Sequence, residues 1–286
     1  MPLGEVGTAV ASARMDGTPY SYLAHLVTLP VRVGDVEARF ALDTGIGPTL
    51  LGEALAHEVG CATNGETFTG RRMSGQEVSV PLADAPPITI GPFTREGHVV
   101  GVLDMSGFPA SLATLDGFLS LAFFEKTAFT VDYPRGVVVV ESPSTLAERA
   151  AHGTSVPVRL DRQGRALVAF LPLTVGALGS IEVEVDMGSD TLILDAGHAA
   201  ALGIRLDDPA VRRFEGLDET GNAYVRCFTH LDETIHVTGA PSLAQTGTDV
   251  MFQEIIYDGL IGDAFLRRFV VTYDQPGERM IFSHAD

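Results

Sequence analysis

Two stretches of this chain repeat the same order of residue types. Residues 33–60 and 175–203 each contain Val-Gly, an alternating segment, Asp-x-Gly and an Ala-containing segment that ends in Gly. The two aspartates, Asp43 and Asp186, lie 143 residues apart (186 minus 43). Similarity at a fixed offset is the signature of repeated structural units. The chain is therefore restricted to folds built from two alike halves.

Further blocks repeat in the same order with nearly the same offset. They are FTGRRMSG (68–75) with FEGLDETG (214–221), DGFLSLAFF (116–124) with DGLIGDAFL (258–266), and TVDYP (130–134) with TYDQP (272–276). The first pair lies 146 residues apart (214 minus 68), and the other two lie 142 apart (258 minus 116, 272 minus 130). Four ordered matches indicate an internal duplication.

The composition excludes several kinds of partner. Of the 286 residues, 19 are Lys or Arg and 37 are Asp or Glu, which gives a formal net charge of −18. Such a surface repels phosphate backbones and anionic lipids, and no basic stretch offsets it. We therefore expect neither nucleic acid nor a membrane as a partner. The hydrophobic content of 45% is sufficient for a substantial core.

The cysteine content and the search for targeting segments indicate which cellular compartment to expect. The two cysteines, Cys61 and Cys227, cannot form a disulfide framework or a Cys-rich zinc site, although one bridge between them is open. The first residues lack the pattern of a signal peptide. No uncharged apolar run reaches the 18 residues that a membrane helix needs. The sequence leads us to expect a cytoplasmic monomer.

The repeats predict where each aspartate lies. Residues 39–42 and 181–185 alternate as strands do, and each Asp follows such a strand. A Gly two residues later permits a tight turn. We predict a mostly β fold of two pseudo-symmetric β-barrel lobes with one short helix each, at 51–60 and 194–203. The expected boundaries are an N-terminal lobe at 1–141, a linker at 142–155 and a C-terminal lobe at 156–286.

Two carboxylates at equivalent strand ends have a specific chemistry when they meet. Both cannot ionise comfortably at close range, so the pair shares one proton. The ionised member can activate a water while the protonated member polarises a carbonyl. Asp43 and Asp186 are therefore the candidate catalytic residues.

These residues resemble a known family. The triplet Asp43-Thr44-Gly45, the block at 68–75 and the triplet Leu260-Ile261-Gly262 look like the retropepsin-like aspartic peptidases (clan AA). Residues 262–282 are similar to the C-terminal part of bacterial members. The resemblance covers roughly 26–141 and 156–282. It implies a single-chain, bilobal acid-protease fold and an aspartic endopeptidase that hydrolyses a peptide or protein substrate with water, without metal or cofactor.

Carried over by position, the resemblance makes Asp43 and Asp186 the catalytic pair. The residues expected to support the pair are Thr44, Gly45, Met187, Gly188, Ser189 and Gly262. Segments 68–80 and 214–226 would be two flaps over the cleft. The flap residues expected to contact substrate are Gly70, Arg71, Arg72, Met73, Ser74 and Gly75 in the first flap, and Leu217, Asp218, Glu219, Thr220 and Gly221 in the second.

Three positions depart from the family pattern. Met187 stands where Thr or Ser follows the second Asp, so half of the interlocking hydrogen bonds should be missing. Ser120 replaces a Gly, and Ile46 replaces a small or hydroxyl residue. These changes leave two alternatives open: a catalytically impaired protein that binds an extended peptide, and an enzyme that uses the pair on a small molecule.

Two charged patterns have competing interpretations. His230, Asp232 and His236 lie at even spacing, so on a strand they could share a face and bind metal, but a solvated strand face is the favoured interpretation. Arg71 and Arg72 in one flap, and the acidic residues 218–219 in the other, could pair across the cleft or could be ordinary hairpin tips. We predict no metal site.

Overall fold

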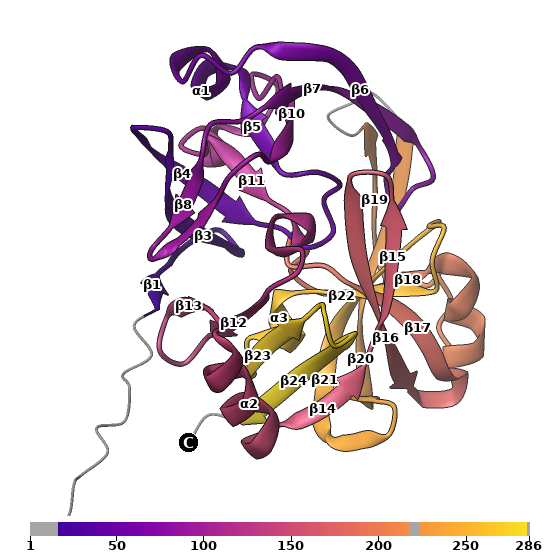
Figure 1. Cartoon of the computed structure of the whole chain (residues 1–286). Coiled ribbons are helices and arrows are strands. Elements are labelled where there is room, and N and C mark those ends of the chain that lie inside the picture. Colours follow the sequence, from indigo (N-terminus) through magenta and orange to yellow (C-terminus); the bar gives the residue numbers. More distant parts are fainter. Residues whose placement is uncertain (1–16, 218–222, 285–286) are drawn as a thin grey trace, which may run out of the picture.

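The computed structural model describes residues 17–217 and 223–284, and it is built mainly from β-strands in three sheets. Its first lobe is a ten-stranded sheet in which β11 lies between β4 and β5 (Figure 1). The strands of this sheet are β2 (Ser21–Leu23), β3 (Leu26–Val33), β4 (Val36–Leu42), β5 (Leu50–Gly52), β6 (Thr63–Arg71), β7 (Glu77–Asp84), β8 (Ile88–Ile90), β9 (Phe93–Arg95), β10 (Val99–Leu103) and β11 (Gly117–Leu119).

The second lobe repeats this arrangement in an eight-stranded sheet, in which β22 lies between β17 and β18. Its strands are β15 (Arg159–Gln163), β16 (Ala166–Val175), β17 (Gly179–Val185), β18 (Leu192–Asp195), β19 (Arg212–Leu217), β20 (Ala223–Val237), β21 (Ala240–Gln253) and β22 (Gly259–Ile261). In each lobe, the strand that precedes the aspartate pairs in parallel with the inserted strand, β4 with β11 and β17 with β22. The predicted mostly β, two-lobed fold is confirmed.

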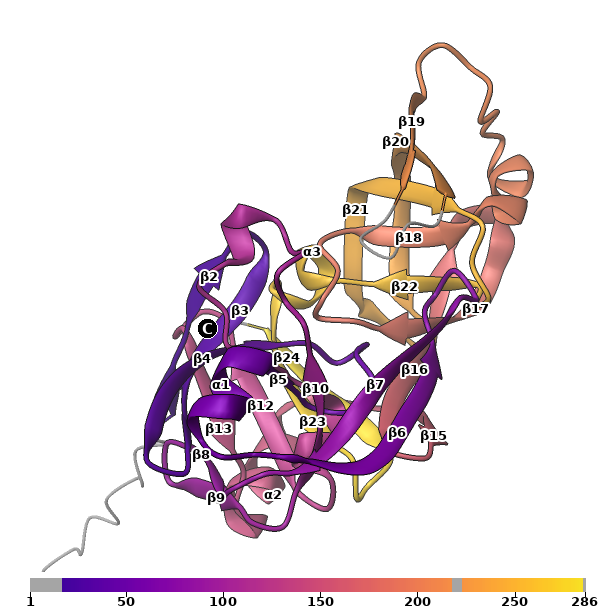
Figure 2. The same cartoon turned by 90° about the horizontal axis from the view of Figure 1, so that it is seen from above.

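A third sheet of six strands joins the lobes (Figures 1 and 2). Its strands come from both halves of the chain: β1 (Thr18–Pro19), β12 (Ala128–Asp132), β13 (Val137–Val140), β14 (Thr154–Pro157), β23 (Phe269–Asp274) and β24 (Arg279–His284). Thr130 of β12 pairs with Thr272 of β23, and their hydroxyls lie 2.6 Å apart. These two residues are 142 positions apart (272 minus 130), so equivalent strands of the two repeats meet here.

Helices are few and short. The segment at 51–60 contains α1 (Glu53–Glu58), and the segment at 194–203 contains a 3₁₀ helix (Ala196–Leu202) that ends at Gly203 with φ of 69°. Further helices are α3 (Asp263–Leu266) and the 3₁₀ turns η1 (Ala110–Leu112), η2 (Leu121–Phe124) and η3 (Gly176–Leu178). No helix within 17–217 or 223–284 is long and apolar enough to cross a membrane.

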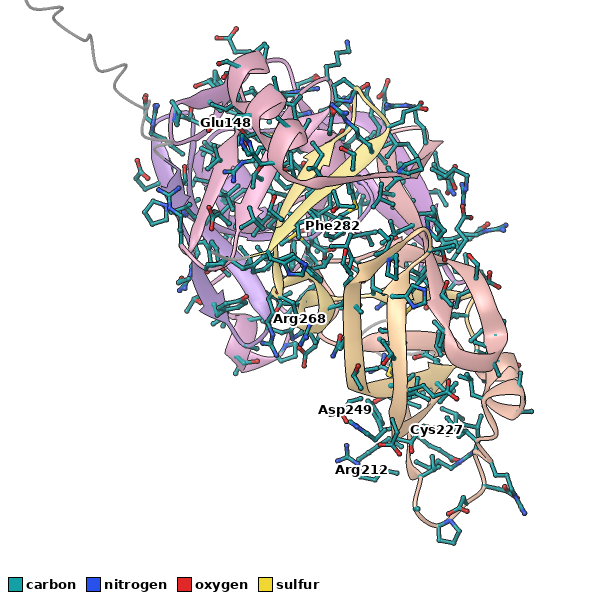
Figure 3. The ribbon with its side chains drawn as sticks, turned by 90° about the horizontal axis from the view of Figure 1, so that it is seen from below. Glu148, Arg212, Cys227, Asp249, Arg268 and Phe282 are labelled. Atoms are coloured by element: carbon teal, nitrogen blue, oxygen red, sulfur yellow. The ribbon has the colours of Figure 1, made fainter. Side chains whose placement is uncertain are left out.

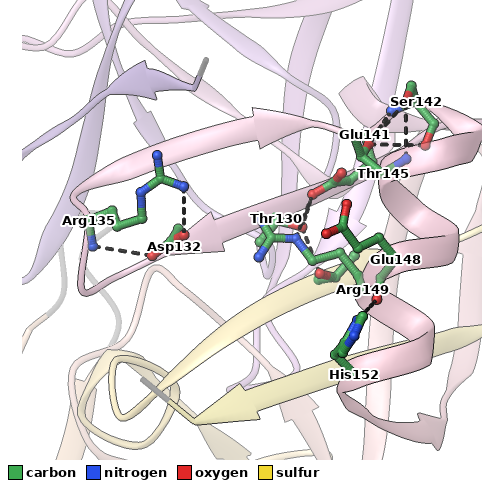
Figure 4. A network of polar contacts seen from close by, with 10 residues as sticks. Thr130, Asp132, Arg135, Glu141, Ser142, Thr145, Glu148, Arg149 and His152 are labelled. Carbon is green, nitrogen blue, oxygen red and sulfur yellow. Dashed lines mark hydrogen bonds and ion pairs between the residues drawn. The ribbon is translucent and has the colours of Figure 1, made fainter. Parts of the chain in front are cut away.

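The segment at 142–155 contains a capped helix that we did not predict, α2 (Pro143–His152). Ser142 and Thr145 form a capping box, and Pro143 occupies the first turn, where its missing N–H is harmless. The helix packs beside β24. Its Arg149 contacts the buried Glu141 at 3.1 Å, and Glu141 also accepts a hydrogen bond from Thr130 (Figure 4). The lobe boundaries themselves stay a prediction.

One apolar core runs through both lobes and the joining sheet. At its centre, Phe129 stacks on Tyr273 with ring centroids 4.7 Å apart, so an aromatic pair links β12 of the first repeat to β23 of the second. Phe282 of β24 lies in the same core, whereas Arg212 lies at the outer end of the second lobe (Figure 3). Cys61 and Cys227 are both buried and free.

Candidate active site

The two aspartates stand at equivalent strand ends. Asp43 follows β4 directly, and its backbone N–H donates to the Leu119 carbonyl at 2.9 Å. Asp186 follows β17, and its N–H donates to the Ile261 carbonyl at 3.0 Å. The inserted strands β11 and β22 therefore hold both turns in the same way. This symmetry follows from the duplication, since matching sequences form matching turns.

Each aspartate lies against the glycine of the opposite turn. A methyl group placed on Gly45 would be 2.5 Å from Asp186 Oδ1, and one placed on Gly188 would be 2.6 Å from Asp43 Cγ. Only a residue without a side chain fits at such distances. The structure thus brings Asp43 and Asp186 together at the junction of the lobes, with each carboxyl over the other's turn.

Replacing Gly188 with alanine tests this close approach. The added methyl would push Asp43 away, and displacement of a reacting group by about 1 Å can cost on the order of 100-fold in rate. We expect the rate of any reaction that depends on the two carboxyls to fall by about that factor in Gly188→Ala, while the circular dichroism spectrum is unchanged. Gly107→Ala is the matched control, because a methyl there meets nothing within 4 Å. Equal activity in the two variants would contradict the close approach.

The two carboxyl groups have different hydrogen-bond partners. Asp43 Oδ1 accepts from the backbone N–H groups of Gly45 (3.1 Å) and Ile46 (3.0 Å). Asp186 Oδ1 accepts from Gly188 N–H at 2.8 Å, and its Oδ2 accepts from the Ser189 hydroxyl at 2.6 Å. Donors to both oxygens of a carboxylate favour its charged form. The difference between Ile46 and Ser189 therefore makes the pair asymmetric.

Burial and the neighbouring Asp186 raise the pKa of Asp43 well above its ordinary value. Two carboxyls this close hold one proton between them, because the second charge would be both desolvated and repelled. Since Asp186 has the extra hydroxyl donor, the proton is placed best on Asp43. The arrangement can thus present one base and one acid to a molecule in the cleft.

Thr44 connects the two turns beneath the carboxyls. Its hydroxyl donates to the Val185 carbonyl at 2.7 Å and accepts from the Met187 N–H at 3.0 Å. The side chain of Met187 is buried in the apolar core and offers no hydroxyl in return. Thr44 therefore makes the hydrogen bonds from the first turn to the second. The side chain of Met187 cannot make the equivalent hydrogen bonds from the second turn to the first.

Ser120 and Gly262 occupy equivalent positions after the inserted strands. A methyl on Gly262 would collide with the Ser189 carbonyl oxygen, which explains the glycine. Ser120 is fully buried, and its hydroxyl lies 3.2 Å from that of Thr49. The polar group that replaces glycine in the first lobe therefore has a partner.

Two contacts near the site could not be predicted from the sequence. His25, from the turn between β2 and β3, places Nε2 2.9 Å from the Gly188 carbonyl oxygen of the opposite lobe. Tyr22 donates to Asp263 Oδ1 at 3.2 Å, again across the lobes. Both side chains come from a hairpin that precedes the repeated blocks, so comparison of the repeats does not reveal them.

The first predicted flap is the β6–β7 hairpin, and it crosses to the second lobe. The Ile256 N–H donates to the Met73 carbonyl at 2.8 Å, and a methyl on Gly75 (φ of 80°) would be 3.0 Å from Ile256 Cγ2. Met73 packs against an apolar cluster of Ile193, Met251 and Leu260. The tip of the hairpin therefore packs against the second lobe.

The other flap residues are distributed along the two hairpins. Gly70 and Arg71 end β6, Arg71 pairs with Glu77 at 3.3 Å, and the turn from Arg72 to Gly75 includes Ser74. In the second hairpin, β19 ends at the exposed Leu217. Asp218, Glu219, Thr220 and Gly221 lie outside the described residues, and so does their suggested pairing with Arg71 and Arg72.

The candidate metal ligands are arranged as follows. His230 Nδ1 lies 2.9 Å from Asp249, and its Nε2 lies 3.9 Å from Asp232. In the part of the chain that the structure describes, no three His, Cys, Asp or Glu side chains gather as a metal site.

The chain resembles known proteins in part of its sequence and in its fold. A family model described as "Aspartyl protease" matches residues 29–122, which include Asp43. The match lies within the first half of the chain and ends before the second repeat begins. Among solved structures, an aspartic proteinase from Irpex lacteus is similar over 95% of this chain and 97% of its own, with a TM-score of 0.56 and 13% identity. At this identity, the similarity shows the fold alone, a bilobal aspartic proteinase fold. No curated protein matches the chain.

Proposed function

We propose that this chain is an aspartic endopeptidase, with Asp43 and Asp186 as its catalytic dyad. The observation that supports this most strongly is the reciprocal approach of the two carboxyls, each seated over the other's glycine. The β6–β7 hairpin crosses to the second lobe at Ile256, as expected for a flap that covers an extended peptide. The raised pKa of Asp43 supplies the protonated member that the mechanism needs.

In the proposed reaction, water between the carboxyls is the nucleophile. Asp186 takes a proton from the water, and Asp43 gives its proton to the carbonyl oxygen of the peptide bond. The resulting tetrahedral intermediate breaks its C–N bond as a proton passes to the nitrogen. The products are a carboxylic acid and an amine, and the dyad returns to its singly protonated state. Thr44 and Ser189 keep the carboxyls in place.

The proposed dyad predicts a bell-shaped pH profile. Asp43 must hold a proton, so activity falls as the pH rises through its raised pKa. At low pH the pair takes a second proton and the base is lost. We therefore expect a maximum in the acidic range, with activity extending above the ordinary pKa of an aspartate, about 3.9. Initial rates on one fluorogenic peptide from about pH 3 to 8 measure the profile. A flat profile would contradict the shared proton.

A diverse peptide pool tests the activity itself. The pool is incubated with the protein over the same pH range, and new termini are identified by mass spectrometry. Cuts that disappear in the double variant Asp43→Asn/Asp186→Asn establish peptide hydrolysis by the dyad and give its preference. Absence of cuts from folded protein at every pH would refute the proposed function.

A second candidate function is peptide binding without cleavage. The buried Met187, which contributes no hydroxyl beneath the second turn, favours it. Under this alternative, peptides from the same pool bind to the protein in a saturable way, and none is cut. Binding measured alongside cleavage therefore separates the two functions.

A further inference from the structure

The two lobes place different chemical groups at equivalent positions beside the dyad. Glu184 precedes Asp186 by two residues, and Ala41 precedes Asp43 by two. Alternate residues of a strand point to the same face of a sheet. Ala41 lies buried in an apolar cluster of the first lobe. At equivalent positions of the two repeats, the first lobe thus has the methyl group of Ala41 and the second lobe has the carboxyl group of Glu184.

The strand register places Glu184 on the face that the flap covers. Glu184 is paired with Phe170 of β16 and with Leu260 of β22, and Leu260 is paired with Ile193 of β18. Paired residues share a face of the sheet. Leu260 and Ile193 belong to the cluster against which Met73 of the flap packs. Glu184 therefore lies on the face of the sheet that Met73 covers, two residues before Asp186.

The Glu184 side chain lacks a partner of its own. The residue is 4% exposed, and its carboxyl makes no hydrogen bond or ion pair with any described residue. Burial and the charges of Asp186, Asp43 and Asp161 raise its pKa well above the ordinary value. The charges that act on it are thus all acidic. Buried carboxyls without a partner are rare, because desolvation is costly.

The neighbouring cation is already engaged. The Arg159 guanidinium lies 4.2 Å above the Phe170 ring and makes a forked contact with Glu182 at 2.7 and 2.9 Å. Glu182 and Glu184 are on the same face of β17, but only Glu182 has this arginine. A positive group for Glu184 would have to come from a bound molecule.

A cavity of about 440 Å³ lies next to this position, and its lining includes Phe170 and Glu182 but not Glu184 itself. Phe170, the strand partner of Glu184, and Tyr257 line it, with their rings edge to face at 5.1 Å. Aromatic rings accommodate the aliphatic stem of a long basic side chain, while its charged end reaches a carboxylate. The cavity thus offers the room and surface that such a side chain needs.

We propose that Glu184 is a specificity-determining residue that selects a Lys or Arg side chain of the peptide bound beside the dyad in the second lobe. The cation would make a charge-assisted hydrogen bond with the carboxyl, which supplies its absent partner. The chain's net charge of −18 favours the approach of cationic peptides. This inference rests on the proposed function, because it assumes that the cleft holds a peptide.

Binding of uncleavable peptides tests the inference separately from catalysis. We would use peptides whose central amide is replaced by a hydroxyethylene group, with Lys, norleucine or Glu at each of the two flanking positions. Calorimetric titration at about pH 6 should show Lys binding at least about tenfold tighter than norleucine at one position, as expected for a buried charge pair. In Glu184→Gln this advantage should fall below about threefold. Glu148→Gln, at an exposed position of α2 away from this cavity, is the matched control and should keep it.

The outcomes separate the inference from the proposed function. A Lys preference that Glu184→Gln removes, in a protein that cuts no ordinary peptide, supports the inference and refutes hydrolysis. Cleavage without any Lys preference, or a preference that Glu184→Gln leaves intact, overturns the inference and leaves hydrolysis standing. Failure of every peptide to bind overturns the inference as well. The comparison of Lys with norleucine peptides is made in the unsubstituted protein. The inference can therefore be contradicted even if Glu184→Gln does not fold.

Discussion

Asp43→Asn is expected to lower peptide hydrolysis by about 10⁴-fold, because general acid–base groups of this kind contribute up to that factor. The amide keeps the shape of the side chain and can still accept from the N–H groups of Gly45 and Ile46. It cannot give a proton to the carbonyl oxygen in the way that a carboxylic acid does. The measurement is kcat/KM on the best peptide from the pool. Retention of more than about a tenth of the activity would rule out the proposed acid.

The same variant should be at least as stable as the parent at neutral pH. The folded-state pKa of Asp43 is raised, so its contribution to stability is fully present below the unfolded-state pKa and is lost as the pH rises through the folded-state pKa. Asparagine cannot ionise and removes that loss. Asp190→Asn is the matched control, because Asp190 is exposed and lies four residues beyond Asp186. It makes the same chemical substitution and should alter neither rate nor stability appreciably.

Arg149→Met is expected to destabilise the fold by about 3–5 kcal/mol, which is the usual cost of removing one member of a buried ion pair. The Glu141 side chain is fully buried, and its Oε1 accepts from Arg149 Nε at 3.1 Å and from the Thr130 hydroxyl. Without the guanidinium, a buried carboxyl would lose its charge partner. The site lies in the joining sheet, so the loss should weaken both lobes together.

Urea unfolding followed by tyrosine fluorescence measures this effect, because the chain has six Tyr and no Trp. Arg135→Met is the control: Arg135 is largely exposed and lies 3.8 Å from Asp132, so its loss should cost less than about 1 kcal/mol. The double variant Arg149→Met/Glu141→Gln should recover part of the stability. Equal unfolding midpoints for Arg149→Met and Arg135→Met would show that the buried ion pair contributes no more to stability than the exposed one.

The duplication made the local geometry of the two aspartates predictable. Each Asp-x-Gly follows an alternating strand, and identical local patterns form identical turns. Thr44 and Met187 could be assigned to the two sides of the junction for the same reason. Their spatial contact depends only on the symmetry that the repeat imposes. The short helix at 143–152 was also encoded locally, by Ser142, Pro143 and Thr145, and was missed because its small polar residues resemble a linker.

The sequence alone determined that two equivalent strands end in aspartates, because strand alternation and turn glycines are local properties that the repeat shows twice. Only the tertiary structure decided which distant groups surround the pair. His25 reaches Gly188, Met73 meets Ile256, and Glu184 lies on the face of the sheet that Met73 covers, without a partner among the described residues. Such contacts depend on strand register and on the packing of one lobe against the other. Both are fixed by interactions between residues far apart in the chain.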